Sequence, residues 1–204
     1  MLRIDDCLEG HVLIGLVLSL ASFVFLILTA FSTPYIRSIT YLDVPSGVSS
    51  GVSFGSFGYC EATAAASVSS CHRSVGYEYG SEIVVWLTRT LILFAFAAMF
   101  MLLAFLALVL SLLKVGKFMW NPIYVRTAAL LGTTLAILSE IFALNLFVTA
   151  RMRYDAQGIR PTYGAALWLG LIGAIAGFLS VCVGGPAFAG RYMYRAHPQR
   201  AYNV

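Results

Sequence analysis

Residues 91–113 read LILFAFAAMFMLLAFLALVLSLL, an apolar run that contains no Asp, Glu, Lys or Arg. A helix rises about 1.5 Å per residue, and about 20 apolar residues cross the hydrocarbon core of a bilayer. Three other blocks are long and apolar enough to do the same, and Glu140 is the only Asp, Glu, Lys or Arg in them: Val12–Phe31, Thr127–Ala150 and Ala165–Phe188. The sequence therefore predicts an all-α membrane protein with a bundle of four transmembrane helices.

The composition agrees with this fold class. The chain is 60% hydrophobic and 11% charged, whereas roughly a quarter of the residues of a soluble domain are charged. Four spans leave no room for a second domain, so residues 1–204 are expected to form one membrane domain. The net charge of +4 comes from Lys and Arg residues dispersed beside the spans. We therefore expect membrane lipids as surroundings and no nucleic-acid partner.

The two ends of the chain are expected on the same side of the membrane. Met1–Gly10 is net acidic, unlike the basic start of a signal peptide, so the first apolar block is expected to remain as a span. The Lys and Arg residues divide almost evenly between the two sides. The positive-inside rule therefore does not decide the orientation.

The cysteines decide the orientation of the chain in the membrane instead. Cys60 and Cys71 lie in the only long loop, residues 32–90, and disulfides persist in oxidising compartments. Both lysines of the chain lie in the middle loop, residues 114–126, and the tail 189–204 carries arginines and no acid. We expect the termini and the middle loop in the cytoplasm and the loop 32–90 outside a plasma membrane.

The loop 32–90 is too long for a simple connection. Ile36–Val44 alternates β-forming and polar residues, the segment 45–47 (Pro-Ser-Gly) then interrupts it, and Val52 and Phe54 recur at period two. Ser74–Tyr79 has a similar alternation. These patterns predict a small antiparallel sheet on top of the bundle. A Cys60–Cys71 bridge would stabilise it by about 2–3 kcal/mol, with two unpaired thiols as the alternative.

A family resemblance follows from the same loop. Gly55-Ser56-Phe57-Gly58-Tyr59-Cys60, followed after ten residues by Cys71, resembles the claudin-superfamily signature G-L-W-x-x-C with its second cysteine. Arg89 resembles the arginine that ends the first claudin loop. Gly and Tyr before the first cysteine, together with the acidic Glu140 in the third span, are similar to the fungal claudin-like tetraspans. These include the PalI pH-response family and eisosome membrane proteins.

The resemblance implies a non-enzymatic tetraspan that organises other membrane components or serves as an auxiliary subunit of a larger complex. In a fungal setting it implies roles in membrane microdomains, cell-wall maintenance or the pH response. The expected partner is another integral membrane protein or a second copy of the chain.

The signature also has a physical interpretation. Gly55 and Gly58 permit a bulge or a close backbone approach. Phe57 is expected to anchor the sheet to the helices, since aromatic side chains favour the membrane interface. Arg89 is expected to be a capping or interface residue beneath the sheet.

Glu140 is predicted near the middle of the third span, where an ionised carboxylate is costly, so we expect it to be protonated. Three interpretations stay open: a hydrogen bond to a neighbouring helix, contact with another membrane protein, or an ion path in an oligomeric channel or transporter. Ser19, Ser22 and Ser180 are the candidate hydrogen-bond partners, and Thr134 and Asn145 the candidate companions in a path.

Gly170, Gly173 and Gly177 line the fourth span, and Gly173 and Gly177 form a G-x-x-x-G pair. Small residues at this spacing let two helices approach closely. The glycines either pack within this bundle or dock a partner helix.

The sequence contains no pattern typical of catalysis or metal binding. The three histidines are scattered without ligand spacing, and P-loop, nucleophile-elbow and C-x-x-C motifs are missing. We therefore expect no metal, no cofactor and no enzymatic activity.

Overall fold

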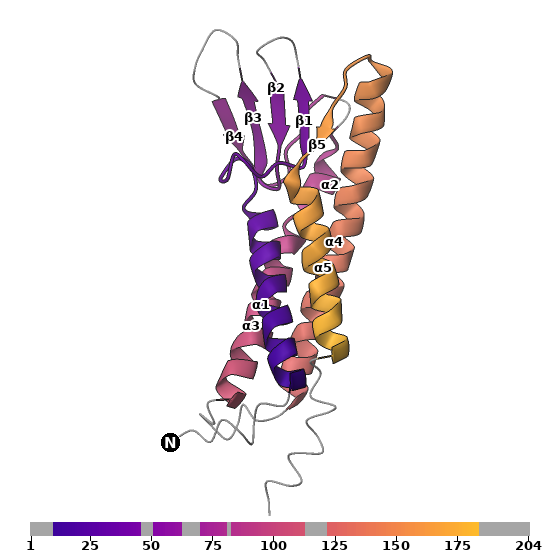
Figure 1. The fold of residues 1–204 in the computed structure, drawn as a ribbon. Helices are drawn as coiled ribbons and strands as arrows, with labels where there is room; N and C mark the ends of the chain where they lie inside the picture. The colour runs from indigo at the N-terminus through magenta and orange to yellow at the C-terminus, as the bar shows by residue number, and fades with distance from the viewer. Residues whose placement is uncertain (1–9, 46–50, 63–69, 81–82, 113–121, 184–204) are drawn as a thin grey trace, which may run out of the picture.

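A computed structural model of the chain describes residues 10–45, 51–62, 70–80, 83–112 and 122–183. It contains four membrane-length helices beneath a small sheet (Figure 1). The helices are α1 (Gly10–Ala30), α3 (Leu93–Leu112), α4 (Pro122–Ala156) and α5 (Ala165–Val183), and a short helix, α2 (Val85–Thr90), precedes α3. The prediction of a multi-pass membrane protein with four helices and a stapled antiparallel sheet is confirmed.

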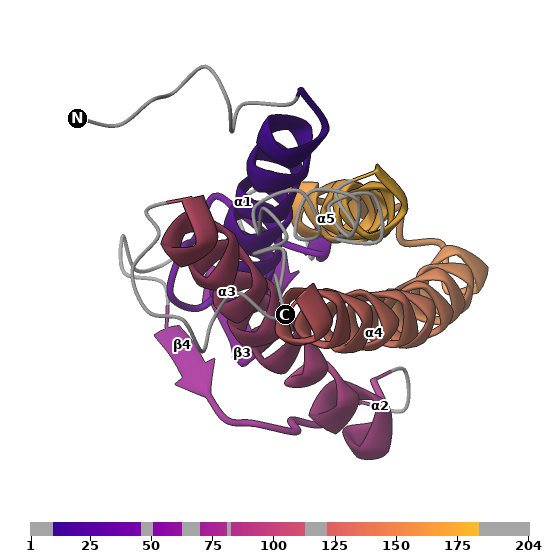
Figure 2. The same cartoon turned by 90° about the horizontal axis from the view of Figure 1, so that it is seen from below.

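The four long helices stand around a common centre (Figure 2). Helix α1 packs between α3 and α5, and α4 packs against the same two helices from the other side. The faces that point outward are apolar, as expected where lipid replaces water. The exposed side chains include Leu13, Val17, Phe96, Leu103, Ile137, Ile141, Ile172 and Phe178.

The sheet is antiparallel with the strand order β4-β3-β2-β1-β5. Four strands come from the first long loop, and they are β1 (Leu42–Pro45), β2 (Gly51–Phe54), β3 (Gly58–Ala62) and β4 (Ser70–Arg73). The fifth, β5 (Thr162–Tyr163), comes from the connection between α4 and α5 and pairs with β1. The two loops on this side of the bundle therefore form one structure.

Two predicted strands were misplaced. The stretch Ile36–Val44 was expected to be extended, but its first part turns back on the end of α1, where Thr33 N–H donates to the Ile39 carbonyl at 2.8 Å. Ser74–Tyr79 was also expected to be a strand, but the strand ends at Arg73 and Gly76 adopts a φ of 73°. Such a left-handed residue interrupts extended backbone. Only Tyr79 makes an isolated bridge, to Ile83.

The helix bounds also differ from the predicted spans. The third span was expected at 127–150, but α4 has 35 residues and a length of about 52 Å. This exceeds a hydrocarbon core of about 30 Å, and α4 continues beside the sheet (Figure 1). The apolar run that begins at Leu91 includes a junction between α2 and α3. Residues 114–121 of the predicted middle loop, residues 184–188 of the fourth predicted span and the tail 189–204 lie outside the described residues.

Candidate functional site

The signature segment lies where the sheet meets the bundle. A Cβ atom on Gly55 would collide with the backbone carbonyl of Thr33, and one on Gly58, whose φ is 147°, would collide with the carbonyl of His72. Both glycines therefore serve a close backbone approach. The Gly55 N–H donates to the Gly58 carbonyl at 2.9 Å and closes the turn between β2 and β3.

Phe57 at the tip of this turn packs against the end of α1. Its ring makes edge contacts with Phe31 and with Tyr35, with ring centroids 6.3 Å apart in each pair. Edge-to-face aromatic pairs stabilise such contacts beyond the area that they bury. These contacts join the turn between β2 and β3 to the residues that follow α1.

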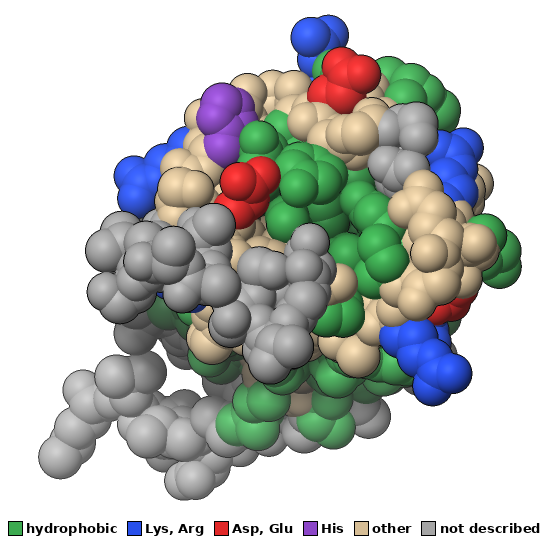
Figure 3. Space-filling model, turned by 90° about the horizontal axis from the view of Figure 1, so that it is seen from above, with side chains coloured by type: hydrophobic (Ala, Val, Ile, Leu, Met, Phe, Trp, Pro, Cys, Tyr) green, Lys and Arg blue, Asp and Glu red, His purple; other side chains and the backbone are tan. Residues whose placement is uncertain are grey.

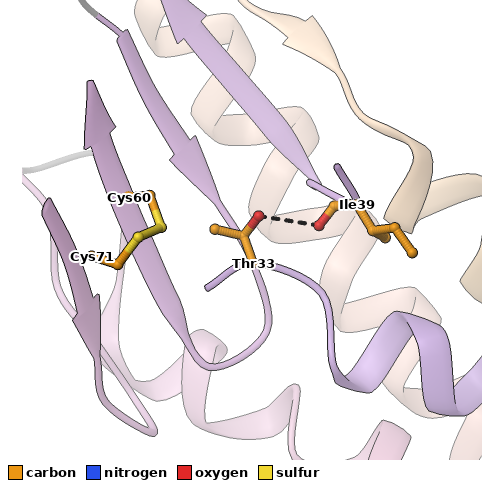
Figure 4. Close-up of a disulfide and its surroundings, with 4 residues drawn as sticks. All are labelled: Thr33, Ile39, Cys60 and Cys71. Carbon is orange, nitrogen blue, oxygen red and sulfur yellow. Dashed lines mark hydrogen bonds between the residues drawn. A yellow bond between two sulfur atoms is a disulfide. The ribbon is translucent and has the colours of Figure 1, made fainter. Parts of the chain in front are cut away.

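Cys60 and Cys71 form a disulfide (Figure 4). They are directly opposite each other on β3 and β4, so the bond joins the outermost strand to its neighbour. The bridge holds an edge strand whose residues are mostly exposed and which has no apolar face of its own. This is the position where a small sheet gains most from a covalent link.

Arg89 lies on α2 beneath the sheet. Its aliphatic stem passes against Gly76, where a Cβ atom would collide with it. The neighbouring Tyr77 is buried and its hydroxyl donates to the Gly55 carbonyl at 2.7 Å, while the Thr88 hydroxyl donates to the Tyr77 carbonyl at 2.8 Å. The segment after β4 is thus tied both to the signature turn and to α2.

A buried polar group beneath the sheet was missed by sequence reasoning. Tyr41 is fully buried, its ring stacks on Phe147 with centroids 4.6 Å apart, and its hydroxyl accepts a hydrogen bond from Ser56. Burial raises the pKa of Tyr41 well above its usual range, the bond from Ser56 opposes this shift, and the Glu140 carboxyl adds to it. Tyr41 fell within an expected strand, and nothing in its alternation indicated this role.

Glu140 lies in the part of the bundle that is nearer the sheet. It is about 27 Å along α4 from Pro122, at a rise of about 1.5 Å per residue. Its carboxyl packs against Gly170 in the second turn of α5 and near Phe94 in the first turn of α3. Both helices begin at the sheet end, so Glu140 lies just below the sheet. The third span was predicted to end at Ala150, whereas α4 continues to Ala156.

The predicted hydrogen bond between Glu140 and a serine is absent. Ser22 donates to the Gly173 carbonyl at 2.8 Å, and Ser19 and Ser180 donate to the carbonyls of Leu16 and Gly15. Within the described chain, neither carboxyl oxygen of Glu140 has a hydrogen-bond partner, and the residue is 4% exposed. Its side chain is enclosed by the helices of this bundle.

The three glycines of α5 pack inside the bundle. Gly170 faces Glu140, Gly173 faces Leu26 on α1, and Gly177 lies against Ser22 of α1 and Thr133 of α4. All three are buried. Of the two interpretations of the G-x-x-x-G pair, the geometry favours packing between helices of the same chain.

Thr134 and Asn145 do not accompany Glu140. Both are exposed on the outward side of α4, near Leu138 and Ile141, which are 46% and 55% exposed. The Thr134 hydroxyl donates to carbonyls of its own helix. Asn145 makes no side-chain hydrogen bond to any residue that the structure describes. The Asn145 amide is therefore directed away from the bundle, near the end of the bundle that carries the sheet.

Among the described residues, no group of three or more His, Cys, Asp or Glu side chains is arranged to hold a metal ion. A scan against models of known protein families found no match for the chain, and a search of curated proteins found none either.

Proposed function

We propose that the chain is a claudin-like tetraspan of a fungal-type plasma membrane that assists or organises a larger membrane complex and catalyses no reaction. The sheet faces the extracellular side in this proposal, because its disulfide requires an oxidising compartment. The start of α1 and the end of α5 lie at the opposite end of the bundle (Figure 1), so the termini are cytoplasmic. Membrane microdomains, the cell wall and the pH response are the settings that the resemblance favours.

The observation that carries the proposal is that some polar residues of the membrane part are enclosed by the bundle, whereas another points outward. Glu140 and the three α5 glycines are used inside the bundle, while Asn145 points outward from α4 beside exposed apolar side chains. An amide at the edge of the hydrocarbon gains by pairing with a polar group of another helix, typically by about 0.6–2 kcal/mol. The outward face of α4 is therefore the proposed contact for a second membrane protein or a second copy.

The oligomeric channel alternative gains no such support. A path shared between copies requires polar side chains on the outer surface, whereas Glu140 is enclosed by α3, α4 and α5. Asn145 and Thr134 lie on another face of α4. We therefore do not assign a transport role to Glu140.

Site-directed photo-crosslinking in native membranes tests the docking proposal. A benzophenone amino acid at position 145 should yield one discrete protein adduct, either with a partner or with a second copy. The same group at Ile172, which is 47% exposed on α5, is the matched control and should yield mainly lipid adducts. Asn145→Leu should also weaken co-purification in a gentle detergent. Recovery of a monomer alone, without a protein adduct at position 145, would contradict the proposal.

A further inference from the structure

A cleft lies between the sheet and the turn that follows α1. It has a volume of about 130 Å³ and is lined by Thr33, Arg37, Ser53, Cys60 and Ala62. Figure 4 shows Thr33 and the disulfide on the two sides of this region. Binding sites for drug-sized molecules measure about 300–1,000 Å³. The cleft can therefore hold a small polar group, but not a whole metabolite.

The surroundings place the cleft at the membrane surface. The apolar helix α1 ends at Ala30, three residues before Thr33. Phe31 and Tyr35, each two residues from Thr33 in the chain, are 43% and 52% exposed. Exposed aromatic side chains gather at the boundary between hydrocarbon and headgroups. The headgroup layer extends about 5–7 Å beyond the hydrocarbon on each side, and a turn that directly follows an apolar membrane-spanning helix falls within it.

The charge of the cleft is basic. Arg37 lines it directly, and Arg73, on the same face of the sheet, lies with its guanidinium 5.3 Å from the centre of the Tyr35 ring. Asp43 is paired with Ser53 across β1 and β2, but its carboxylate accepts a hydrogen bond from Thr40 at 2.7 Å and does not line the cleft. Seen from above (Figure 3), basic side chains also lie at separated points around the rim of this end.

We propose that this cleft binds the phosphate group of a membrane lipid from the leaflet on the sheet side. The Arg37 guanidinium would donate to the phosphate oxygens, a geometry that favours Arg over Lys. The Ser53 hydroxyl is placed to donate to the same group. Phe31 and Tyr35 would contact the upper part of the acyl chains, and Arg73 adds positive charge near the phosphate. This inference needs only the membrane position of the sheet and does not depend on the docking face of α4.

Native mass spectrometry of the purified full chain tests the proposal by titration with two lipids of identical acyl chains. Phosphatidic acid carries the phosphate and diacylglycerol lacks it. The wild type should retain phosphatidic acid with at least about tenfold higher affinity, and Arg37→Ala should lose most of this difference. Arg37→Lys should retain part of it. Arg160→Ala is the matched control, since it removes an exposed arginine next to β5, at the opposite edge of the sheet from the disulfide-linked strands, and should behave as the wild type.

Three outcomes would overturn the proposal. Equal retention of both lipids by the wild type would show that the phosphate is not recognised. Equal effects of Arg37→Ala and Arg160→Ala would place the lipid elsewhere. Displacement of phosphatidic acid by an equal concentration of inorganic phosphate would identify a soluble anion as the ligand. The first and third comparisons use the wild type alone, so they decide the matter even if a variant fails to fold.

Discussion

The junction between sheet and bundle and the seam between α4 and α5 both depend on glycines, but the glycines face different neighbours. At the junction, Gly55 lies against the backbone carbonyl of Thr33, and its own carbonyl accepts a hydrogen bond from Tyr77. In the seam, Gly170 lies against the end of the Glu140 side chain, whose oxygens have no partner among the described residues. The backbone at the junction cannot move aside, whereas the side chain in the seam can rotate.

This difference determines how each region responds to an amino-acid substitution. Polar groups at the junction are joined by short hydrogen bonds that link α1, the signature turn and the segment after β4. The seam is held mainly by close helix packing around a single buried carboxyl group. We therefore expect an added side-chain atom at Gly55 to destabilise the protein more than one at Gly170, and two variants test this contrast while a third, Tyr77→Phe, measures one hydrogen bond of the junction.

Gly55→Ala should have the largest effect. The added Cβ meets the Thr33 backbone, so the turn and the end of α1 must separate, at a cost at or above the upper end of about 1–3 kcal/mol. Thermal unfolding followed by fluorescence-detected size exclusion in detergent measures the loss. Gly51→Ala is the control, because its Cβ would lie 3.2 Å from the nearest atom, the Val44 carbonyl oxygen. Equal losses in the two variants would refute the contrast.

Gly170→Ala should have an intermediate effect that depends on Glu140. The methyl group meets the carboxyl group, which can rotate away at a cost within about 1–3 kcal/mol. In a Glu140→Ala background the obstacle is gone, so the same substitution should cost less, with a coupling energy of about 0.5–3 kcal/mol. Thermal unfolding of the four members of this double-mutant cycle measures the coupling. Additive losses would mean that the two residues do not share a contact.

Tyr77→Phe should have the smallest effect, a loss of about 1–2 kcal/mol, because the Gly55 carbonyl loses its donor. Burial raises the pKa of Tyr77 above its ordinary value of 10.0. The unfolded chain therefore releases this proton first. The stabilisation by Tyr77 should be complete below about pH 10 and decrease above it. Melting temperatures measured from about pH 8 to 11 should fall less steeply for Tyr77→Phe than for the wild type.

The sequence predicted the membrane part well because one property, a run of apolar residues, determines it. Helix α1 begins and ends within two residues of the expected span. The length of α4 was not predictable in this way, because its last turns pack beside the sheet and not against lipid. Thr134 and Asn145, the candidate companions of Glu140, lie on another face of this helix.

The sequence predicted a small antiparallel sheet with a disulfide, but it did not predict all of the strands. The pairing of Cys60 with Cys71 followed from their shared compartment, and Gly55 and Gly58 were identified as close-approach positions. The strand β5 has two residues and lies over a hundred positions from its partner β1, so no local pattern could indicate it. Tyr41 and Arg37 acquire their surroundings only when the turn after α1 folds back on the sheet.

The central claim is that the sheet faces the oxidising side of the membrane as a covalently closed unit. Labelling with a membrane-impermeant maleimide, in a chain with Cys7→Ser and Cys182→Ser, tests it most directly. On intact cells, Cys60 and Cys71 should stay unlabelled until an impermeant reductant is added outside, and both should then react. Labelling from the cytosolic face of inverted vesicles, or labelling of either cysteine without reduction, would contradict the account.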